Sequence, residues 1–285
     1  MKTYNDLYLD LRHTLKAGGV EDYNLEAKLL IGAAAGKTRE ELIRDMRLYA
    51  LGDVEEKAAE LTRRRLAGEP VAYVLGEWEF MGLPFTVDKS VLIPRPDTEL
   101  LAGLAIRLLR ARVGSEVRVL DLCTGTGCVG ISIAKLVASC RVVLVDNSPG
   151  AVRLARENVL RNNVSRNTIC VNADVRRDPP MLLGKFDLIV CNPPYVPTGE
   201  IQTLDRGVRD FEPRAALDGG RDGLDLYRAI IPNWTGILKE NGCALFECGE
   251  EQAGKIQEML KSAGFKSTAA YPDPAGTLRV VAGVI

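Results

Sequence analysis

Short β-rich runs alternate with helical segments from Thr98 to the end of the chain, and this alternation limits the possible folds more than any other feature. The clearest helical segments span 128–138, 148–162 and 224–239. The β-rich runs are 117–122, 141–145, 168–172, 186–191, 243–248, 265–271 and 278–284. Because repeated strand–helix units build a mainly parallel sheet with helices on both faces, we expect an α/β domain. Only Pro272 to Gly276 separates the last two runs, which is too short for a parallel crossover, so we expect an antiparallel hairpin at one edge.

Residues 1–72 carry helical patterns only. Leucines recur at helical spacing near the start of the chain, at Leu7, Leu11 and Leu15. Thr38 and Glu41 have the spacing of a capping box, in which each side chain bonds to the other residue's backbone amide. We expect further helix caps at Asn24 and Asp53. This part of the chain therefore predicts a small helical domain.

Residues 73–96 differ in character from the helices before them. Aromatic and β-branched residues surround Gly82, namely Tyr73, Trp78, Phe80, Phe85 and Val87. This composition predicts a β-hairpin. Pro94 and Pro96 then prevent a helix from starting before residue 97. We therefore expect a helical domain over 1–72, a linking hairpin over 73–96 and the α/β domain over 97–285.

Composition excludes several classes of protein. The chain has 285 residues, 46% of them apolar, and a net charge of −1, which argues against a nonspecific nucleic-acid binder. Its seven cysteines form no C-x-x-C pair, so we expect free thiols in a reducing compartment and no metal site. The N-terminus is charged where a signal peptide is apolar, and no run approaches the roughly 20 apolar residues of a membrane span. These features predict a soluble, cytoplasmic protein.

A glycine loop, Cys123-Thr124-Gly125-Thr126-Gly127, follows the first strand of the α/β domain. Such a loop faces the ligand crevice of a doubly wound sheet, and its glycines let the backbone approach a ligand. The stretch from Gly125 to Gly130 also matches the dinucleotide pattern G-x-G-x-x-G. However, Asp121 would repel a pyrophosphate, whereas a carboxylate suits the cationic sulfonium and amino group of S-adenosylmethionine. We therefore favour a methyl donor over a dinucleotide.

Two further acids follow the next two strands. Asp146 lies about 20 residues past the glycine loop, where an acid can accept hydrogen bonds from ribose hydroxyls. Its alternative role is helix capping, although Ser148 can cap the following helix without it. Asp174 can accept from an adenine amino group while Val175 packs against the ring. A plain turn role for Asp174 is equally open.

The run Asn192-Pro193-Pro194-Tyr195 follows the fourth strand of the sheet and indicates the chemistry. The prolines restrict the backbone, so the Pro193 carbonyl can point into the crevice beside the Asn192 side-chain carbonyl. Two acceptors on one NH2 group raise the electron density on a planar amide nitrogen and stabilise the positive charge that develops there. Tyr195 can stack on a flat substrate. We expect all four residues to bind substrate, with Asn192, Pro193 and Tyr195 catalytic; the alternative is a rigid loop that merely ends the strand.

N-P-P-Y occurs in amino-methyltransferases that act on adenine, guanine or glutamine, so the substrate needs a second discriminator. Three stretches supply it: GEPVAYVLGEWEFMGLPF at 68–85, LIPRPDTE at 92–99 and VRDFEP at 208–213. Together they resemble the release-factor glutamine N5-methyltransferase family, the PrmC/HemK group, over nearly the whole chain. The resemblance implies a Rossmann-like class I methyltransferase fold with a seven-stranded sheet, a helical N-terminal domain for substrate recognition and a linking hairpin.

The resemblance also implies a substrate, the glutamine of the Gly-Gly-Gln motif in class-I peptide chain release factors. S-adenosylmethionine would be the cofactor and S-adenosylhomocysteine its product. Asn192 and Pro193 would hold the glutamine amide beside Tyr195, and Phe85 would close over the cofactor. The chain departs from the family pattern at Cys123, where glycine is usual. The cofactor-binding residues that we expect are Phe85, Asp121, Cys123, Thr124, Gly125, Thr126, Gly127, Asp146, Asp174, Val175 and Asn192.

Three alternatives remain. One is a glutamine methyltransferase that acts on a ribosomal protein, which sequence separates imperfectly from the first interpretation. The second is a nucleic-acid N6-adenine methyltransferase, which predicts a basic groove and an added recognition domain, and neither is evident at a net charge of −1. The third is a degenerate binding module, against which the intact Gly125, Gly127, Asp146 and Asn192 count. We expect a monomer with a release factor as its partner and no direct contact with nucleic acid or membrane.

Overall fold

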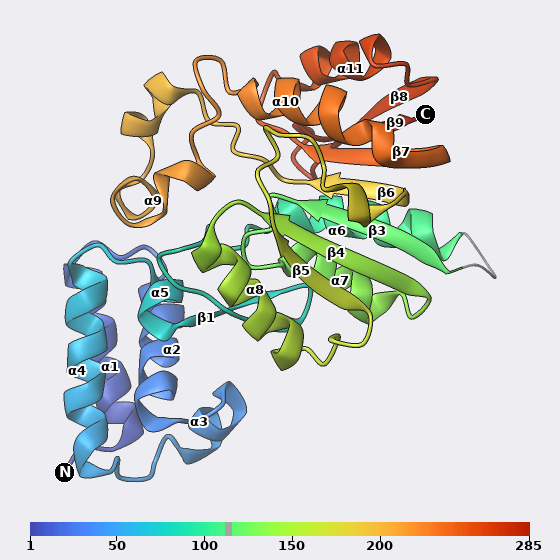
Figure 1. Ribbon diagram of the computed structural model, residues 1–285. Helices are drawn as coiled ribbons and strands as arrows, with labels where there is room; N and C mark the ends of the chain where they lie inside the picture. Colours follow the sequence, from blue (N-terminus) through green and yellow to red (C-terminus); the bar gives the residue numbers. More distant parts are fainter. Residues whose placement is uncertain (112–115) are drawn as a thin grey trace. The chain divides into compact units, whose positions relative to one another are not determined.

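The computed structural model describes residues 1–111 and 116–285 (Figure 1). The helices are α1 (Tyr4–Ala17), α2 (Tyr23–Ala35), α3 (Arg39–Asp45), α4 (Gly52–Leu66), α5 (Val71–Leu75), α6 (Thr98–Arg110), α7 (Cys128–Leu136), α8 (Pro149–Arg161), α9 (Arg206–Phe211), α10 (Asp225–Trp234) and α11 (Ala253–Ser262). The strands are β1 (Glu77–Phe80), β2 (Leu83–Thr86), β3 (Val117–Leu122), β4 (Cys140–Asp146), β5 (Thr168–Asn172), β6 (Phe186–Cys191), β7 (Leu238–Glu247), β8 (Ser267–Pro272) and β9 (Leu278–Val284). Within the described residues, no helix combines the length and apolar character needed to cross a bilayer.

The chain divides into two compact units, and the regular elements of the first are helices, apart from Glu77, which begins β1. The first unit comprises residues 1–77 together with the segment 205–211, which carries α9. The predicted leucines of α1 are buried in its core with residues of α2 and α4; the core includes Leu7, Leu11, Leu15, Leu30, Ile31 and Val54. Gly68 adopts a φ of +101° beside α9, where a side chain would come within 3.5 Å of the Phe211 ring. A segment distant in sequence thus completes this unit.

The predicted helix caps of this unit have different outcomes. The capping box is confirmed: the Glu41 amide donates to the Thr38 hydroxyl at 3.2 Å, and the Thr38 amide donates to the Glu41 carboxylate at 2.9 Å. The cap at Asn24 is wrong because α2 begins one residue before it. The cap at Asp53 is also wrong, since Asp53 lies inside α4 and its carboxylate pairs with Lys57 at 2.7 Å.

The second unit, residues 78–204 and 212–285, contains the predicted seven-stranded sheet. The strand order is β5-β4-β3-β6-β7-β9-β8. Strands β3 to β7 pair in parallel, and β9 pairs antiparallel with both β7 and β8. The seven strands and the antiparallel hairpin at one edge confirm the predicted fold class.

Helices cover both faces of this sheet. Alternate residues of β3 face opposite sides, so Val119 packs in the core beneath α6, α7 and α8, while Leu120 packs in the core beneath α10 and α11. The hairpin β1–β2 joins the first of these cores through Phe80 and Phe85, whose rings meet edge to face with centroids 6.2 Å apart. The central strands β3, β4 and β6 are buried on both faces, which explains their nearly continuous apolar sequences.

The predicted helix over 224–239 is wrong at its end. Helix α10 stops at Trp234, a short 3-10 turn spans Thr235–Ile237, and β7 begins at Leu238. Leu238 pairs with Phe186 of β6. The hydrogen bonds and burial of a central strand outweigh the local helical pattern there.

The hairpin is shorter than the segment predicted for it. Tyr73 lies in the short helix α5, and the hairpin itself occupies 77–86. Met81 and Gly82 form its two-residue turn with φ values of +53° and +72°. Positive φ at both turn positions is the conformation that fits the right-handed twist of the paired strands.

Candidate active site

The strand order places two loops side by side at the carboxyl end of the sheet. Strands β3 and β6 are neighbours, although β4 and β5 lie between them in sequence. Their last paired residues are Leu122 and Cys191. From β3 the chain first builds the sheet outward on one side through β4 and β5, then on the other through β6 and β7. Such a switch point is where open α/β sheets bind ligands.

A cavity opens at this switch point and reaches both loops. Its lining residues are Ser90, Val91, Leu92, Pro94, Arg95, Thr98, Asp121, Cys123, Thr124, Gly125, Thr126, Cys128, Val129, Asp146, Asn147, Ser148, Ala151, Val175, Arg176, Asn192, Pro194, Pro213, Ala215, Ala216 and Leu226. All of them belong to the second unit. The glycine loop and Asn192 therefore face one common space.

The glycine loop owes its shape to three left-handed residues. Cys123, Gly125 and Gly127 have φ values of +55°, +53° and +83°. Gly130 has a different requirement: a Cβ there would lie 2.2 Å from a methyl group of Leu144 and 2.9 Å from the Asp121 carboxylate. The third glycine of the G-x-G-x-x-G string thus allows α7 to pack closely on the sheet, and this steric role explains the string without a pyrophosphate.

Asp121 is a buried carboxyl group in the cavity wall, 2% exposed. Its Oδ2 accepts hydrogen bonds from the Thr124 hydroxyl at 2.6 Å and from the Gly130 amide at 2.9 Å. Burial raises its pKa to about 7, and the nearby Asp146 contributes in the same direction. An acid in this state is readily stabilised in its charged form by a cationic ligand.

Asp146 joins the glycine loop to the end of β4. One oxygen accepts from the Gly125 amide at 2.9 Å and the other from the Ser148 amide at 2.9 Å. Burial raises the pKa of this carboxyl group. The helix cap itself is Ser148, whose hydroxyl accepts from the Ala151 amide at 3.3 Å, so Asp146 is free of that role.

A fully buried asparagine, Asn158 of α8, links the hairpin to the glycine loop. Its Oδ1 accepts from the Thr86 amide at 2.7 Å, and its Nδ2 donates to the carbonyls of Thr86 and Thr126, each at 3.0 Å. Both N–H groups and the carbonyl oxygen of the side-chain amide are therefore hydrogen-bonded. The hairpin and the glycine loop are held in one position relative to each other.

Asn192, the first residue after β6, borders the cavity with its side chain fixed at one end. The Nδ2 group donates to the Thr98 hydroxyl at 3.2 Å. Thr98 is the first residue of α6 and is itself 3% exposed. Because the nitrogen end bonds to Thr98, the Oδ1 end remains for a ligand in the cavity.

Tyr195 is held at both ends. Its hydroxyl donates to Oε1 of Glu247, the last residue of β7, at 3.4 Å, and its backbone carbonyl accepts from Gln252 Nε2 at 2.9 Å. Burial, followed by the Glu247 carboxylate, raises the pKa of the Tyr195 phenol, so the hydroxyl remains a donor. The ring is thus oriented by buried polar groups.

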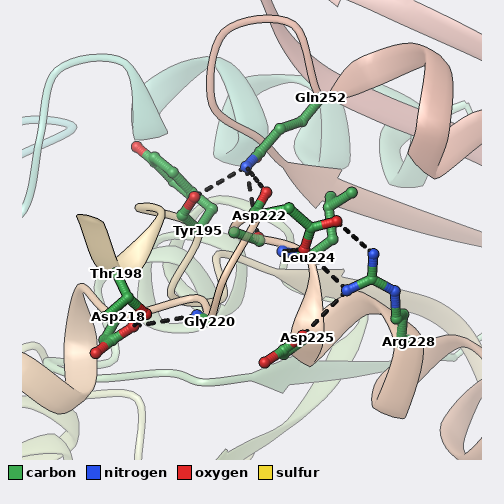
Figure 2. A network of polar contacts seen from close by, with 10 residues as sticks. Tyr195, Thr198, Asp218, Gly220, Asp222, Leu224, Asp225, Arg228 and Gln252 are labelled. Atoms are coloured by element: carbon green, nitrogen blue, oxygen red, sulfur yellow. Dashed lines mark hydrogen bonds and ion pairs between the residues drawn. The ribbon is translucent and has the colours of Figure 1, made fainter. Parts of the chain in front are cut away.

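Gln252 organises the loop beyond N-P-P-Y (Figure 2). Its Nε2 lies between the Tyr195 carbonyl and the carbonyls of Asp222 and Gly223, at 3.5 and 3.4 Å from the latter two. Its Oε1 accepts from the Gly249 amide at 2.9 Å. One buried amide therefore ties together the loop after β6, the loop before α10 and the loop after β7.

An ion pair joins two further segments of the cavity wall. Arg95 donates to the Glu212 carboxylate, which also accepts from the Ile93 amide at 3.3 Å. Glu212 is buried, and burial raises its pKa against the opposing effect of Arg95. The pair joins the segment before α6 to the segment at 212–216, and both segments line the cavity.

Comparison with known proteins identifies the family. Residues 6–76 match the PrmC N-terminal domain family, and residues 102–207 match the methyltransferase small domain family. A release factor glutamine methyltransferase of Geobacter sulfurreducens is 41% identical over 280 residues, which cover 96% of this chain and 94% of that protein. One of Clostridium botulinum is 32% identical over 97% of each chain. The chain belongs to the release factor glutamine methyltransferase family.

Similarity to one solved structure supports the fold of this chain and nothing beyond the fold. A methyltransferase from Pyrococcus furiosus aligns with 79% of this chain and 98% of its own, with a TM-score of 0.53 and 17% sequence identity. At that identity the likeness concerns the Rossmann-like architecture, which agrees with the strand order described above.

Most residues predicted for the cofactor site of this release factor glutamine methyltransferase family member lie together in the cavity wall. They are Asp121, Cys123, Thr124, Gly125, Thr126, Asp146, Val175 and Asn192. Val175 is fixed there because Trp234 Nε1 donates to its carbonyl at 3.0 Å. Pro194 of the predicted substrate site also lines the cavity.

Other predicted residues lie outside the lining. Phe85 is fully buried in the core beneath α6 to α8, so its ring packs inside the protein and does not close over the cavity. Asp174 accepts from the Arg176 amide at 3.0 Å, which is the turn role left open above. Pro193, Tyr195 and Gly127 stand next to lining residues without lining the cavity themselves.

Several site residues were missed by the sequence interpretation. Thr98 and Arg95 line the cavity. Both lie within the LIPRPDTE stretch, which served above only for the family resemblance. Glu247 ends β7 and Gln252 lies five residues beyond it, and nothing in their local sequence marks them as site residues.

Proposed function

We propose that this chain transfers a methyl group from S-adenosylmethionine to the side-chain amide nitrogen (N5) of a glutamine, in the Gly-Gly-Gln motif of class-I peptide chain release factors. One observation carries the proposal: the glycine loop and Asn192 line a single cavity at the switch point of the sheet. Membership of the release factor glutamine methyltransferase family selects glutamine over adenine and guanine.

The residues of the glycine-loop side fit S-adenosylmethionine. When bound, it supplies an electrophilic methyl group on a cationic sulfur. Asp121 is a buried acid with a pKa raised to about 7, and a cation favours its charged form. The Asp146 carboxylate at the end of β4 stands where ribose hydroxyls can donate to it. The left-handed Gly125 leaves the cavity unobstructed by a side chain at that point of the loop.

The N-P-P-Y side is suited to hold a planar amide. Asn192 Oδ1 is the available end of an amide whose nitrogen bonds to Thr98. In our proposal this oxygen and the Pro193 carbonyl accept the two N–H groups of the glutamine. Two fixed acceptors hold the nitrogen toward the donor and stabilise the positive charge that develops on it during transfer. Tyr195 stands next to the lining residue Pro194, so in this proposal its ring would approach the flat amide from the edge of the cavity.

No strong base is required in this scheme. The amide nitrogen becomes acidic once it carries the methyl group, and its extra proton leaves to water. The Tyr195 phenol, with its pKa raised, remains protonated throughout. The chain therefore contributes orientation and electrostatic stabilisation more than proton transfer.

The test combines purified full-length chain, radiolabelled S-adenosylmethionine and a purified class-I release factor. We expect one labelled glutamine, located by mass spectrometry of the modified peptide in the Gly-Gly-Gln motif. A release factor with Gln replaced by Ala in that motif is the matched substrate control and should take up no label. Label on DNA or on a ribosomal protein, with none on the release factor, would sink the proposal.

A further inference from the structure

Gln252 occupies the position before helix α11, but its side chain does not cap that helix. The residue is 7% exposed, and its side chain makes no cap hydrogen bond. The amide points instead to the loop that follows β6, where Nε2 donates to the Tyr195 carbonyl at 2.9 Å (Figure 2). Its Oε1 accepts from the Gly249 amide at 2.9 Å. A buried glutamine that leaves its own helix uncapped and binds another loop indicates a role in holding that loop.

Two glycines of the loop before α10 let that loop close tightly on the same segment. A Cβ at Gly223 would lie 2.1 Å from the Tyr195 carbonyl oxygen and 2.3 Å from Gln252 Nε2. A Cβ at Gly219 would lie 2.7 Å from the Pro194 carbonyl oxygen and 2.8 Å from Tyr195 Cα. Real Cβ atoms are not found this close to other heavy atoms, so only glycine permits the approach. The Tyr195 carbonyl is therefore enclosed between the Gln252 amide and the backbone of a neighbouring loop.

The N-P-P-Y run is thereby anchored at both ends. At its start, Asn192 directly follows β6, which is paired with β3 on one side and β7 on the other. At its end, Gln252 holds the Tyr195 carbonyl. The two prolines between these anchors have a fixed φ and no amide hydrogen with which to form a hydrogen bond of their own. The direction of the Pro193 carbonyl therefore depends on both anchors.

We propose that Gln252 is a positioning residue for the methyl transfer: by holding the Tyr195 carbonyl, it sets the direction of the Pro193 carbonyl that accepts an N–H group of the substrate. The inference rests on the proposed function. Each proline ring fixes φ and leaves ψ free to rotate. When Tyr195 is released, rotation about ψ turns the Pro193 carbonyl away from the substrate nitrogen, and one of the two fixed acceptors is lost.

A side-chain amide suits this position because its surroundings need both a donor and an acceptor. The carbonyl oxygens of Tyr195, Asp222 and Gly223 lie 2.9, 3.5 and 3.4 Å from Nε2. The Gly249 amide nitrogen lies 2.9 Å from Oε1. An ionised carboxylate can only accept, so it would oppose three carbonyl oxygens, whereas a protonated carboxyl group keeps one donor. Gln252→Glu should therefore hold the loop only while the introduced carboxyl group is protonated.

The experiment measures single-turnover transfer at saturating donor and release factor. Gln252→Met removes both hydrogen-bonding groups at nearly constant length. We expect it to lower the rate about 10- to 100-fold, because small displacements of a reacting group have effects of that size, while donor affinity stays within about 3-fold. Gln257→Met is the matched control and should keep the wild-type rate, because Gln257 lies on the same helix and donates to Thr268 of β8 at 3.4 Å.

The pH dependence of Gln252→Glu gives a readout that a general loss of structure does not give. The ionisable groups on the segments around this position are Tyr195, Arg221, Asp222, Asp225, Arg228, Glu247, Cys248, Glu250 and Glu251. All are present in both proteins, so the ratio of variant to wild-type rate isolates the introduced carboxyl group. Burial favours its neutral form, which donates to Tyr195. The ratio should fall about 10-fold as the pH rises from 6 to 9 and the donor is lost.

A second readout needs no substrate. The chain has two Pro-Pro pairs, Pro179-Pro180 and Pro193-Pro194. Proline labelled with 13C at the carbonyl and with 15N therefore gives two signals from directly bonded carbonyl and nitrogen atoms, and Pro180→Ala assigns them by removing one. The Pro193 carbonyl signal should shift or broaden in Gln252→Met, because the carbonyl shift depends on the backbone angles. The Pro179 signal serves as the internal reference, and Gln257→Met should leave both signals unchanged.

The outcomes distinguish this inference from the proposed function. If the wild type leaves release factors unlabelled, the proposed function fails, and the Pro193 signal still decides whether Gln252 sets that carbonyl. If the wild type is active, an unchanged rate in Gln252→Met or an unmoved Pro193 signal overturns the inference. A rate ratio that does not fall with pH overturns it as well. A loss of donor affinity as large as the loss of rate, or movement of both proline signals, would replace positioning by a general disturbance of the fold.

Discussion

The two halves of the cavity are built on different physical principles. The glycine-loop half, with Asp121 and Asp146, places carboxylates in the cavity wall and holds them with nearby backbone amides. The N-P-P-Y half places a neutral amide at the cavity and orients it through Thr98, which lies 94 residues away in sequence. The glycine-loop half is suited to bind a charged ligand, and the N-P-P-Y half is suited to orient a neutral amide group. They should therefore respond to different changes.

The largest effect is expected from Asn192→Ala. Removing a fixed acceptor for the developing charge should lower the transfer rate about 10³-fold, while donor affinity stays within about 3-fold. Rapid-quench kinetics and calorimetry with S-adenosylmethionine measure the two quantities. If donor binding were lost as well, the division between the two halves would be broken, since Asn192 would belong to the glycine-loop half.

Asp146→Asn should have the converse effect. Replacing charge-assisted hydrogen bonds to the ribose should weaken donor binding about 10- to 100-fold and leave the rate at saturating donor nearly unchanged. Asp174→Asn is the comparison, because Asp174 lies outside the cavity lining and caps a turn. An equal loss of affinity in Asp174→Asn would show that the bound donor reaches it.

Donor affinity should depend on pH through Asp121. Its pKa is raised to about 7, so the group is largely neutral below that pH and loses its attraction for a cation. Because a cationic ligand binds the ionised form, affinity should fall about 10-fold between pH 8 and pH 6. Calorimetry across that range measures the change. Asp121→Asn should bind more weakly with a flatter profile, and an unchanged slope in that variant would assign the titration to another group.

The smallest effect is expected at Cys123. Its φ of +55° is unfavourable for a residue with a Cβ. Cys123→Gly should raise the free energy of unfolding by about 0.5 to 1 kcal/mol, with the gain limited by the freer unfolded chain. Denaturant unfolding of both proteins measures it. A loss of stability instead would mean that the partly buried Cys123 side chain contributes more by packing than it costs in backbone strain.

The sequence alone predicted those features of the fold and the site that are marked by a local pattern of residues. The glycine loop and N-P-P-Y each follow an apolar strand, so the parallel sheet brings them to the same edge, and the antiparallel edge hairpin followed from a connection too short for a crossover. Prediction from sequence failed where a contact between distant residues determines the secondary structure. The segment at 235–239 continues a helical pattern, yet Leu238 pairs with Phe186 in the sheet.

The support of the site was equally hidden from sequence. Thr98 begins a helix, Glu247 ends a strand, and Gln252 precedes another helix, so each has an ordinary local explanation. Only the strand order, which sets β7 beside β6, reveals that Glu247 stands behind Asn192. The family resemblance also implied that Phe85 closes over the cofactor, whereas the residue is packed in a core.

The pairing of Leu122 with Cys191 also sets the distance between the glycine loop and the N-P-P-Y loop where they leave the sheet. The two loops start from adjacent, hydrogen-bonded strands, and adjacent strands lie about 4.8 Å apart in any sheet. In the proposed reaction, the distance over which the methyl group is transferred therefore depends on the spacing of two adjacent strands, which varies little between sheets. Changes in either loop can alter what is bound, but the spacing of the two loops at their bases is set by the pairing of β3 with β6.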